Sequence, residues 1–342
     1  MTELTHIVSA LLAHGKGILA ADESDSTCAK RFDTYGIEKT EDMRRTWREL
    51  LFGTPNVAKG LSGIILYDET LRQKASTGEP FPEFLSKRGI LSGIKVDQKT
   101  ESLAGSPEEE VTKGLEGLQD RLTEYGRLGA TFTKWRAVIR IGEGIPTEQC
   151  LRENGKRLAL YAKACQNAGL VPIAEPEVLL EGTHTLARSE EVLTKTLAVM
   201  FEEMKKAEVS LSEMILKSSM ALPGKESPQQ GSGQAGEKAS LKEIAEATLR
   251  AFAASVPREM PGIVFLSGGQ TPLEATERLN EIVKEAKKQE LPWRITFSYS
   301  RALQEPVLKA WSGKTENVTT AQETFEKRVE ETARASEGRY SH

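Results

Sequence analysis

The segments that decide the fold are FTKWRAVI at residues 132–139 and VPIAEPEVL at residues 171–179. Both are nearly continuous apolar runs interrupted by charges, not strict alternations of apolar and polar residues. Runs of this kind are typical of strands buried on both faces of a parallel sheet. Similar runs recur at residues 17–22, 62–67, 91–96, 213–220, 262–268 and 295–300. The sequence therefore predicts eight buried strands.

Helical patterns separate these strands. Apolar residues recur at three- and four-residue intervals in residues 107–125, 149–168 and 186–206, and Thr147 and Ser189 are the predicted N-caps of two of these helices. The first 17 residues predict a short amphipathic helix. Alternating strands and helices predict a closed (β/α)8 TIM barrel of the α/β class, with extra N-terminal and C-terminal helices. The alternative is an open doubly wound sheet, which usually needs fewer strands and a glycine-rich turn after the first one.

The chain length fits one barrel domain over residues 1–342, since such barrels use about 200 to 400 residues. One stretch differs in composition. Residues 224–240, GKESPQQGSGQAGEKAS, are rich in Gly, Ser and Gln and contain few apolar side chains. We expect a mobile surface loop here. It follows the sixth predicted strand, so it is either a tolerated insertion or a lid over the site.

Composition excludes several classes of protein. The chain has 46 Lys+Arg and 50 Asp+Glu, a net charge of −4, which gives no electrostatic reason to expect nucleic acid or an anionic membrane as partner. No apolar run approaches the ~18 residues of a membrane span. Three cysteines without a CxxC motif indicate a reducing, cytoplasmic location, and four scattered histidines without HExxH predict no metal site.

Charged residues lie within the predicted strands or at their ends, where a packed core would not admit them unless they are paired or used in chemistry. Side chains two residues apart on a strand share a face, so these charges would gather inside the barrel at its C-terminal mouth, where enzymes of this architecture carry their chemistry. The alternative is a set of unrelated ion pairs that stabilise the barrel. The residues are Asp22, Lys95, Lys134, Arg136, Glu175, Glu177 and Lys217.

Lys217 is the predicted nucleophile. Lowering the pKa of a lysine by ~3 units requires about 4 kcal/mol, and apolar surroundings and neighbouring cations both act in that direction. Residues 214–216 and 220 are apolar, and other lysines lie on neighbouring strands. This favours a Schiff base with a carbonyl substrate, whose iminium acts as the electron sink without a metal or another cofactor. Glu175 and Glu177 would then transfer protons.

Phosphate binding is predicted at the ends of the last two strands. Ser267-Gly268-Gly269 ends the seventh strand, and Ser298 to Arg301 end the eighth. Loops at these positions of a barrel commonly bind phosphate through backbone N–H groups and a basic residue. Ser24, Thr27, Lys30 and Arg31 follow the first strand and are candidates for a second anion site. Two phosphate sites flanking a lysine indicate a doubly phosphorylated sugar.

The segments GILAADES, GIKVD, FTKWR, PIAEPEVL, MILK, FLSGGQ and FSYSRALQ occur in this order. Together they resemble the class I fructose-1,6-bisphosphate aldolases, from about Leu11 to Tyr340. The resemblance implies reversible, metal-independent cleavage of fructose 1,6-bisphosphate to dihydroxyacetone phosphate and glyceraldehyde 3-phosphate, by a cytoplasmic enzyme that is often a homotetramer. The alternatives are a preference for sedoheptulose 1,7-bisphosphate or fructose 1-phosphate, or a non-catalytic scaffold protein.

The resemblance also implies residue roles. Lys217 matches the Schiff-base lysine, Glu175 the general acid/base of imine formation and Glu177 its companion. Asp22 matches the aspartate that takes the hydroxyl proton during carbon–carbon cleavage, and Lys134 the lysine that assists both steps. The substrate- and phosphate-binding set is Ser24, Thr27, Arg31, Lys95, Arg136, Ser267, Gly268, Gly269, Ser298 and Arg301.

The chain departs from the family pattern in two places. Ser218 and Ser219 follow the lysine where the familiar form has Pro and Asn, and Ser300 replaces the glycine before the arginine. At position 300 a side chain therefore stands where backbone normally approaches the near phosphate.

Overall fold

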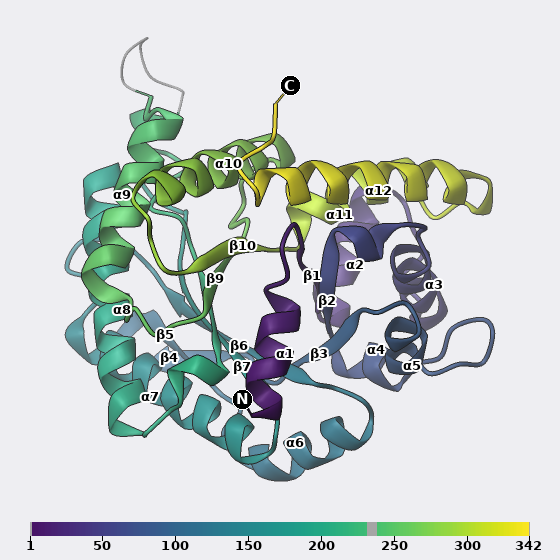
Figure 1. Cartoon of the computed structure of the whole chain (residues 1–342), viewed down its shortest axis with the longest axis horizontal. Coiled ribbons are helices and arrows are strands. Elements are labelled where there is room, and N and C mark those ends of the chain that lie inside the picture. The colour runs from purple at the N-terminus through teal and green to yellow at the C-terminus, as the bar shows by residue number, and fades with distance from the viewer. Residues whose placement is uncertain (1, 231–237, 342) are drawn as a thin grey trace.

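The computed structural model describes residues 2–230 and 238–341 and shows a closed barrel of parallel strands surrounded by helices (Figure 1). Around the barrel the strands follow the order β1-β10-β9-β8-β7-β6-β3-β2. Their bounds are β1 Gly17–Ala21, β2 Leu61–Leu66, β3 Leu91–Lys95, β6 Phe132–Ile139, β7 Val171–Val178, β8 Ile215–Ser218, β9 Gly262–Phe265 and β10 Arg294–Tyr299. The predicted TIM barrel is confirmed, and the open doubly wound sheet is wrong.

Helices follow the strands and cover the outside of the barrel (Figure 1). They are α2 Asp25–Thr34, α3 Glu41–Phe52, α4 Asp68–Arg72, α5 Phe81–Ser86, α6 Leu118–Arg127, α7 Glu148–Asn167, α8 Leu186–Lys206, α9 Leu241–Ser255, α10 Pro272–Lys288, α11 Arg301–Trp311 and α12 Val318–Ala335. Short 3-10 turns are η1 Val57–Lys59, η2 Leu211–Glu213, η3 Pro228–Gln230 and η4 Thr315–Asn317. The long C-terminal helix α12 packs against α10 and α11, as an addition to the barrel.

Helix α1, Glu3–Leu11, closes the N-terminal end of the barrel. Figure 1 shows it lying across the opening. Its buried face, which includes Leu4, Val8 and Leu11, forms one apolar cluster with inward-facing strand residues such as Phe132 and Ile173. Because this cluster fills the N-terminal end of the described barrel, the inside of the barrel is open to a ligand from the carboxyl ends of the strands.

The register between β6 and β7 decides which charges meet. The two strands pair in parallel over their whole length, with Arg136 opposite Glu175 and Val138 opposite Glu177. Next to them, Ala174 of β7 pairs with Leu216 of β8, so continuing this register places Glu175 beside Lys217. The charges predicted to gather inside the barrel therefore come from neighbouring strands at the same height.

Two details of the sequence prediction are wrong. Residues 107–125 are not one helix, because β5, Ser106–Thr112, pairs antiparallel with β4, Thr100–Leu103, and the helix begins only at Leu118. The buried Glu109 ties this hairpin to the start of α7 by accepting hydrogen bonds from Thr147 N and Oγ1 at 2.7 and 2.6 Å. Ser189 is not an N-cap, since it lies inside α8, whose cap is Thr185. Thr147 caps α7 as predicted.

The predicted loop at residues 224–240 is only partly described, since residues 231–237 lie outside the described residues. Before this gap, the backbone N–H groups of Gly224 and Lys225 donate hydrogen bonds to the carbonyls of His184 and Leu180 at 2.8 and 2.7 Å. After the gap, Ser240 begins α9 with a capping box. Whether the segment acts as a lid stays a prediction.

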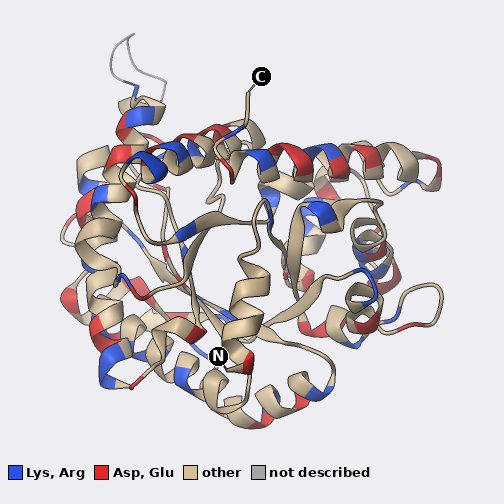
Figure 2. Ribbon diagram, viewed as in Figure 1, with Lys and Arg blue, Asp and Glu red and all other residues tan. Residues whose placement is uncertain are grey.

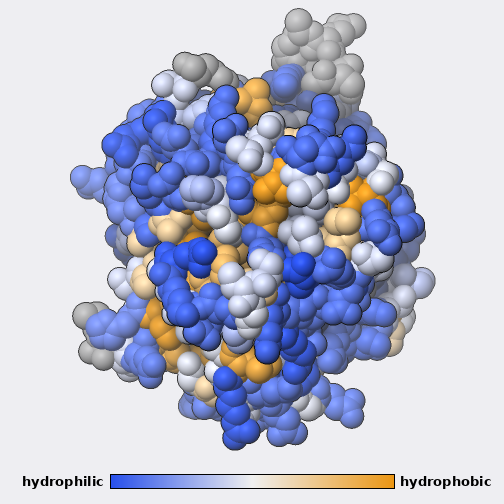
Figure 3. Space-filling view, turned by 90° about the vertical axis from the view of Figure 1, so that its right-hand side faces the viewer, coloured by the Kyte–Doolittle hydropathy of each residue, from blue (hydrophilic) through white to orange (hydrophobic). Residues whose placement is uncertain are grey.

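Lys and Arg alternate with Asp and Glu along the outer helices (Figure 2). Hydrophilic residues cover most of the face shown in Figure 3, where hydrophobic residues show in separate areas. Within the described ranges, no helix is both long enough and apolar enough to cross a membrane. Cys28, Cys150 and Cys165 are buried and free.

Candidate active site

A cavity of about 450 Å³ opens at the carboxyl ends of the barrel strands. It is lined by residues of β1, β6, β7, β8 and β10 and of the segments that follow β1, β9 and β10. The lining residues are Ala20, Asp22, Thr27, Lys30, Arg31, Thr34, Lys134, Arg136, Glu175, Glu177, Lys217, Leu266, Ser267, Gly268, Ser298, Ser300, Arg301 and Glu305. All of the charges predicted inside the barrel except Lys95 therefore line one cavity.

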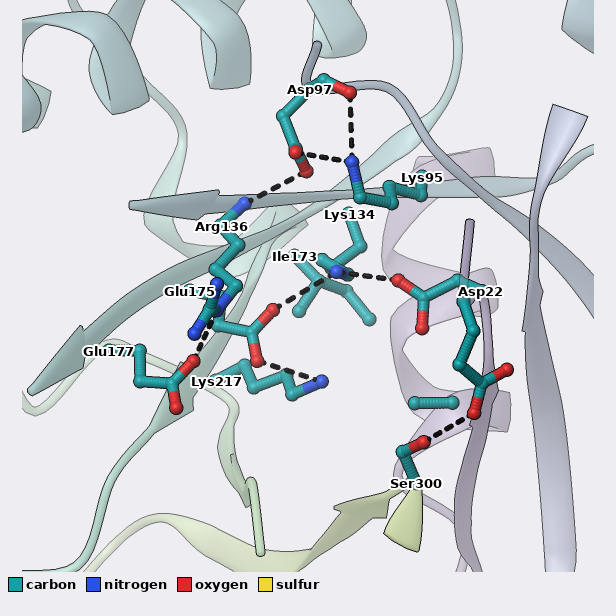
Figure 4. Close-up of polar contacts among 12 residues, drawn as sticks. Asp22, Lys95, Asp97, Lys134, Arg136, Ile173, Glu175, Glu177, Lys217 and Ser300 are labelled. Carbon is teal, nitrogen blue, oxygen red and sulfur yellow. Dashed lines mark hydrogen bonds and ion pairs between the residues drawn. The ribbon is translucent and has the colours of Figure 1, made fainter. Parts of the chain in front are cut away.

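Glu175 lies between two lysines at the base of the cavity (Figure 4). Its Oε1 is 2.9 Å from Lys217 Nζ and its Oε2 is 3.3 Å from Lys134 Nζ. All three residues are buried, with 3 to 4% of their surface exposed. Burial alone would raise the pKa of Glu175, but the charges of Lys217 and Lys134 outweigh this and lower it. The nearest charged group to the Lys217 amine is thus a carboxylate, and Lys134, a lysine on a nearby strand as the sequence predicted, contacts the other oxygen of that carboxylate.

Lys134 joins Glu175 to Asp22. The Lys134 Nζ lies 2.6 Å from Asp22 Oδ2, across the barrel from β7 (Figure 4). Burial would raise the pKa of Asp22, but the ammonium groups of Lys134 and Lys217 hold it well below its usual range. Burial would lower the pKa of Lys134, yet Asp22 and Glu175 raise it. The carboxylate of Asp22 is therefore ionised and faces the same cavity as the Lys217 amine.

A second pair of charges lies beside this cluster. Arg136 Nε donates a hydrogen bond to Glu177 Oε2, and both side chains line the cavity. Lys95 does not line it. Its Nζ contacts Asp97, donating a hydrogen bond to the Asp97 carbonyl at 2.9 Å, and Asp97 Oδ2 accepts one from Arg136 N at 3.2 Å. The structure thus brings Arg136 and Glu177 to the site as predicted and places Lys95 at its edge.

The segments after β9 and β10 form the end of the cavity predicted to bind phosphate. Gly268 and Gly269 have positive φ angles of 51° and 86°, a backbone conformation that side chains disfavour. Arg301 is the first residue of α11, whose N-terminus carries free N–H groups and a positive dipole end. The Ser298 hydroxyl is buried without a hydrogen-bond partner in the described part of the chain. The unpaired Ser298 hydroxyl, the N-terminus of α11 and the Arg301 guanidinium are groups that can bind an anion such as phosphate.

The residues after β1 divide into two groups. Thr27, Lys30 and Arg31 line the cavity. Ser24 does not line it, and its hydroxyl contacts those of Ser26 and Thr27 at 3.1 Å. Gly269 is also absent from the lining, although a Cβ added there would lie 3.5 Å from Arg301 Nη2.

Sequence reasoning missed a buried cluster next to the cavity. It consists of Glu23, Arg48 and Gln304, and it contacts Ser300 and Arg31, which line the cavity. Glu23 and Asp97 directly follow the predicted strands at residues 17–22 and 91–96, so the rule that found Asp22 could have found them as well. Nothing in the local pattern of α3 marks Arg48, which lies between the apolar residues Trp47 and Leu50.

No set of three or more His, Cys, Asp or Glu side chains within residues 2–230 and 238–341 could hold a metal ion. The polar groups that face the cavity are ammonium, guanidinium, carboxylate and hydroxyl groups. They can bind phosphates, transfer protons and offer one amine as nucleophile.

Comparisons with known proteins agree with this geometry. A family model for fructose-bisphosphate aldolase class-I matches residues 3–342. The chain is 46% identical over 339 residues to a probable fructose-bisphosphate aldolase class 1 of Xanthomonas axonopodis pv. citri, covering 99% of this chain and 98% of the relative. It is 45% identical to the cytosolic fructose-bisphosphate aldolase 5 of Arabidopsis thaliana, covering 99% and 92%.

Among solved structures, the fold is similar to fructose-bisphosphate aldolase from Plasmodium falciparum, crystallised with TRAP and a small-molecule inhibitor. The TM-score is 0.94 at 40% sequence identity, and the match covers 99% of this chain and 95% of that one.

Proposed function

The chain belongs to the class I fructose-bisphosphate aldolase family and is an enzyme of that class, a lyase, and we propose that Lys217 forms its Schiff base. In the proposed reaction, fructose 1,6-bisphosphate is cleaved reversibly to dihydroxyacetone phosphate and glyceraldehyde 3-phosphate. The observation that carries this proposal is the contact of 2.9 Å between the buried Lys217 amine and Glu175 at the base of the cavity.

Imine formation comes first. The Lys217 amine, once deprotonated, attacks the ketone carbon of the sugar and forms a carbinolamine. Glu175 lies within reach of Nζ, so it accepts the proton that the Lys217 ammonium loses before the attack and later gives it to the carbinolamine hydroxyl, which leaves as water. The ketone oxygen becomes that hydroxyl by taking the proton that the nitrogen loses after the attack. Lys134, at 3.3 Å from the same carboxylate, stabilises its negative charge while the proton is away.

Carbon–carbon cleavage follows. The Asp22 carboxylate takes the proton of the C4 hydroxyl, the C3–C4 bond breaks, and its electron pair moves to the iminium to give an enamine. Glyceraldehyde 3-phosphate leaves. Protonation of the enamine carbon and hydrolysis of the imine release dihydroxyacetone phosphate and restore the Lys217 amine. Asp22 suits this role because the neighbouring ammonium groups keep it ionised.

The phosphates hold the sugar in place at both ends. The near phosphate lies at the segments after β9 and β10, where Ser267, Gly268, Ser298 and Arg301 present backbone N–H groups, hydroxyls and one guanidinium. The far phosphate lies toward Lys30 and Thr27 after β1. Arg136 and Glu177 lie beside Glu175 and line the cavity as a pair, where they orient the substrate hydroxyls.

Trapping with borohydride tests the mechanism. Protein incubated with dihydroxyacetone phosphate and sodium borohydride should gain one reduced adduct, and peptide mapping should place it on Lys217. The Lys217→Ala variant should gain none and should lose cleavage activity. Full activity of this variant would reject the mechanism, and loss of activity with EDTA would reject its independence of metal.

The same proposal covers substrate, assembly and location. We expect fructose 1,6-bisphosphate to have a higher kcat/KM than fructose 1-phosphate or sedoheptulose 1,7-bisphosphate. We propose one domain over residues 1–342, a homotetramer by family resemblance, and a cytoplasmic location like that of the Arabidopsis relative named cytosolic. Light scattering on the purified chain tests the tetramer, and absence of any cleavage activity would favour the scaffold alternative.

A further inference from the structure

We propose that Ser300 is a positioning residue, whose hydroxyl holds Glu23 so that Arg31 is presented to the near phosphate; this rests on the function proposed above. Ser300 Oγ donates a hydrogen bond of 2.7 Å to Glu23 Oε1 and accepts one of 3.2 Å from Arg31 Nη2. Figure 4 shows the Ser300 hydroxyl directed away from the Glu175–Lys217 pair. Ser300, Arg31 and Arg301 all line the cavity.

The position of Ser300 in the chain does not by itself explain this contact. Ser300 is the N-cap residue of α11, and a serine there usually accepts a hydrogen bond from the first turn of its own helix. Here the side chain makes no capping hydrogen bond. Its hydroxyl instead contacts Glu23 and Arg31, which follow β1. This tertiary contact joins the end of β10 to the segment after β1, its neighbour in the barrel.

Glu23 is the centre of this cluster. Its Oε1 also accepts hydrogen bonds from Gln304 Nε2 at 2.8 Å and from Arg31 Nη1, while its Oε2 lies 2.7 Å from Arg48 Nη2. Glu23, Arg48 and Gln304 are buried, with 8%, 2% and 1% of their surface exposed. A buried carboxylate without partners is costly, so each of these contacts helps to keep Glu23 in place.

The cluster and the two residues that it contacts divide into a fixed part and a part that faces the substrate. Arg48 and Gln304 do not line the cavity, whereas Arg31 and Ser300 do. When a phosphate attracts Arg31, Glu23 loses one cation but keeps Arg48, and it keeps hydrogen bonds from Ser300 and Gln304. Ser300 therefore allows Arg31 to contact phosphate without leaving a buried carboxylate unsatisfied.

The same geometry assigns Arg31 to one of the two phosphates. Sequence reasoning placed Arg31 with the residues after the first strand, as a candidate for a second anion. Its contact with Ser300, which directly precedes Arg301, places its guanidinium at the end formed by β9 and β10. We therefore expect Arg31 to serve the phosphate next to the imine carbon, which fructose 1-phosphate also carries.

Removing the hydroxyl tests the inference. Ser300→Ala should raise the KM for fructose 1,6-bisphosphate about 10-fold, as expected for a lost hydrogen bond to a charged group, with kcat changed by less than about 3-fold. The KM for fructose 1-phosphate should rise by the same factor. The conservative variant Ser300→Thr, which keeps the hydroxyl, should stay within about 2-fold of the wild type. If the alanine variant does not fold, Ser300→Gly, which also lacks the hydroxyl, replaces it.

A double-mutant cycle with Arg31→Ala separates positioning from a purely structural role. If Ser300 acts through Arg31, then Ser300→Ala should add no further rise in KM to the Arg31→Ala variant. Additive effects, or a fall in kcat with KM unchanged, would overturn the inference while leaving the aldolase reaction intact. Wild-type protein without cleavage or trapping would instead contradict the proposed function, so the two failures are distinguishable.

Discussion

Replacing Glu175 by glutamine removes one charge and almost no volume, so it isolates the role of this carboxylate. In the structure Glu175 is 3% exposed and neutralises two buried ammonium groups, at 2.9 and 3.3 Å. Lys134 retains Asp22 at 2.6 Å in the variant, but Lys217 has no other ion-pair partner in the described part of the chain. Removing one partner of a buried pair costs about 3 to 5 kcal/mol, and we expect the lower value because only Lys217 is left unpaired.

The kinetic effect follows from the proton transfers. General acid–base catalysis contributes about 10²- to 10⁴-fold, or about 3 to 5 kcal/mol of activation free energy. The assay is a time course of borohydride trapping with dihydroxyacetone phosphate, followed by intact mass. In Glu175→Gln the adduct should appear about 10²- to 10⁴-fold more slowly but should still map to Lys217.

Glu109→Gln is the matched control. Glu109 is 1% exposed and accepts two hydrogen bonds from Thr147, and neither residue lines the cavity. This variant should lose stability but should trap at the wild-type rate. If folded Glu175→Gln also traps at the wild-type rate, Glu175 is not the acid/base of imine formation.

Three other predictions follow from the same site. Lys217→Arg keeps a positive charge beside Glu175 but cannot form an imine, so intact mass should show no trapped adduct and cleavage should fall by at least about 10⁴-fold. Arg301→Met should raise the KM for fructose 1,6-bisphosphate about 10- to 100-fold, measured by steady-state kinetics, because a charge-assisted contact to phosphate is lost. The pKa values of Asp22 and Glu175 are lowered in the folded protein, so the two ionised carboxylates stabilise the fold. This contribution to stability is fully present above about pH 4.5, where these groups are ionised in the unfolded chain as well, and is lost as the pH falls below about 4. Thermal unfolding between pH 7 and pH 3 should show this loss, and Asp22→Asn should reduce it; an unchanged slope would contradict the ion-pair assignment.

The sequence alone determined the barrel and most of its site. Eight apolar runs separated by helical patterns favour a closed parallel barrel, because strands buried on both faces have such continuous hydrophobic sequences. Charges within those runs, such as Glu175 and Lys217, were expected to face the interior near the carboxyl ends. Side chains alternate between the two faces of a strand, and parallel strands all end at the same edge of the sheet. Both facts depend only on the local sequence, so one sequence is enough to predict which charges share a face and an end.

The sequence prediction failed where contacts depend on distant residues. Residues 107–125 contain a strand because Ser106–Thr112 pairs with β4, and the contact of Glu109 with Thr147 ties that hairpin to α7. Ser189 was mistaken for a cap because its local neighbours fit the pattern, whereas its hydroxyl accepts a hydrogen bond from Leu222 N at 3.1 Å.

Only the tertiary structure decided how the charges divide among partners. The sequence showed lysines and carboxylates at one end of a barrel, but not that Glu175 is shared by Lys217 and Lys134, nor that Lys95 turns to Asp97. An ion pair forms only when the two charged groups lie a few ångströms apart, but the strands that carry these groups are separated by tens of residues in the sequence. Register and closure of the barrel set those distances, whereas the pattern along the chain sets only which side chains are available.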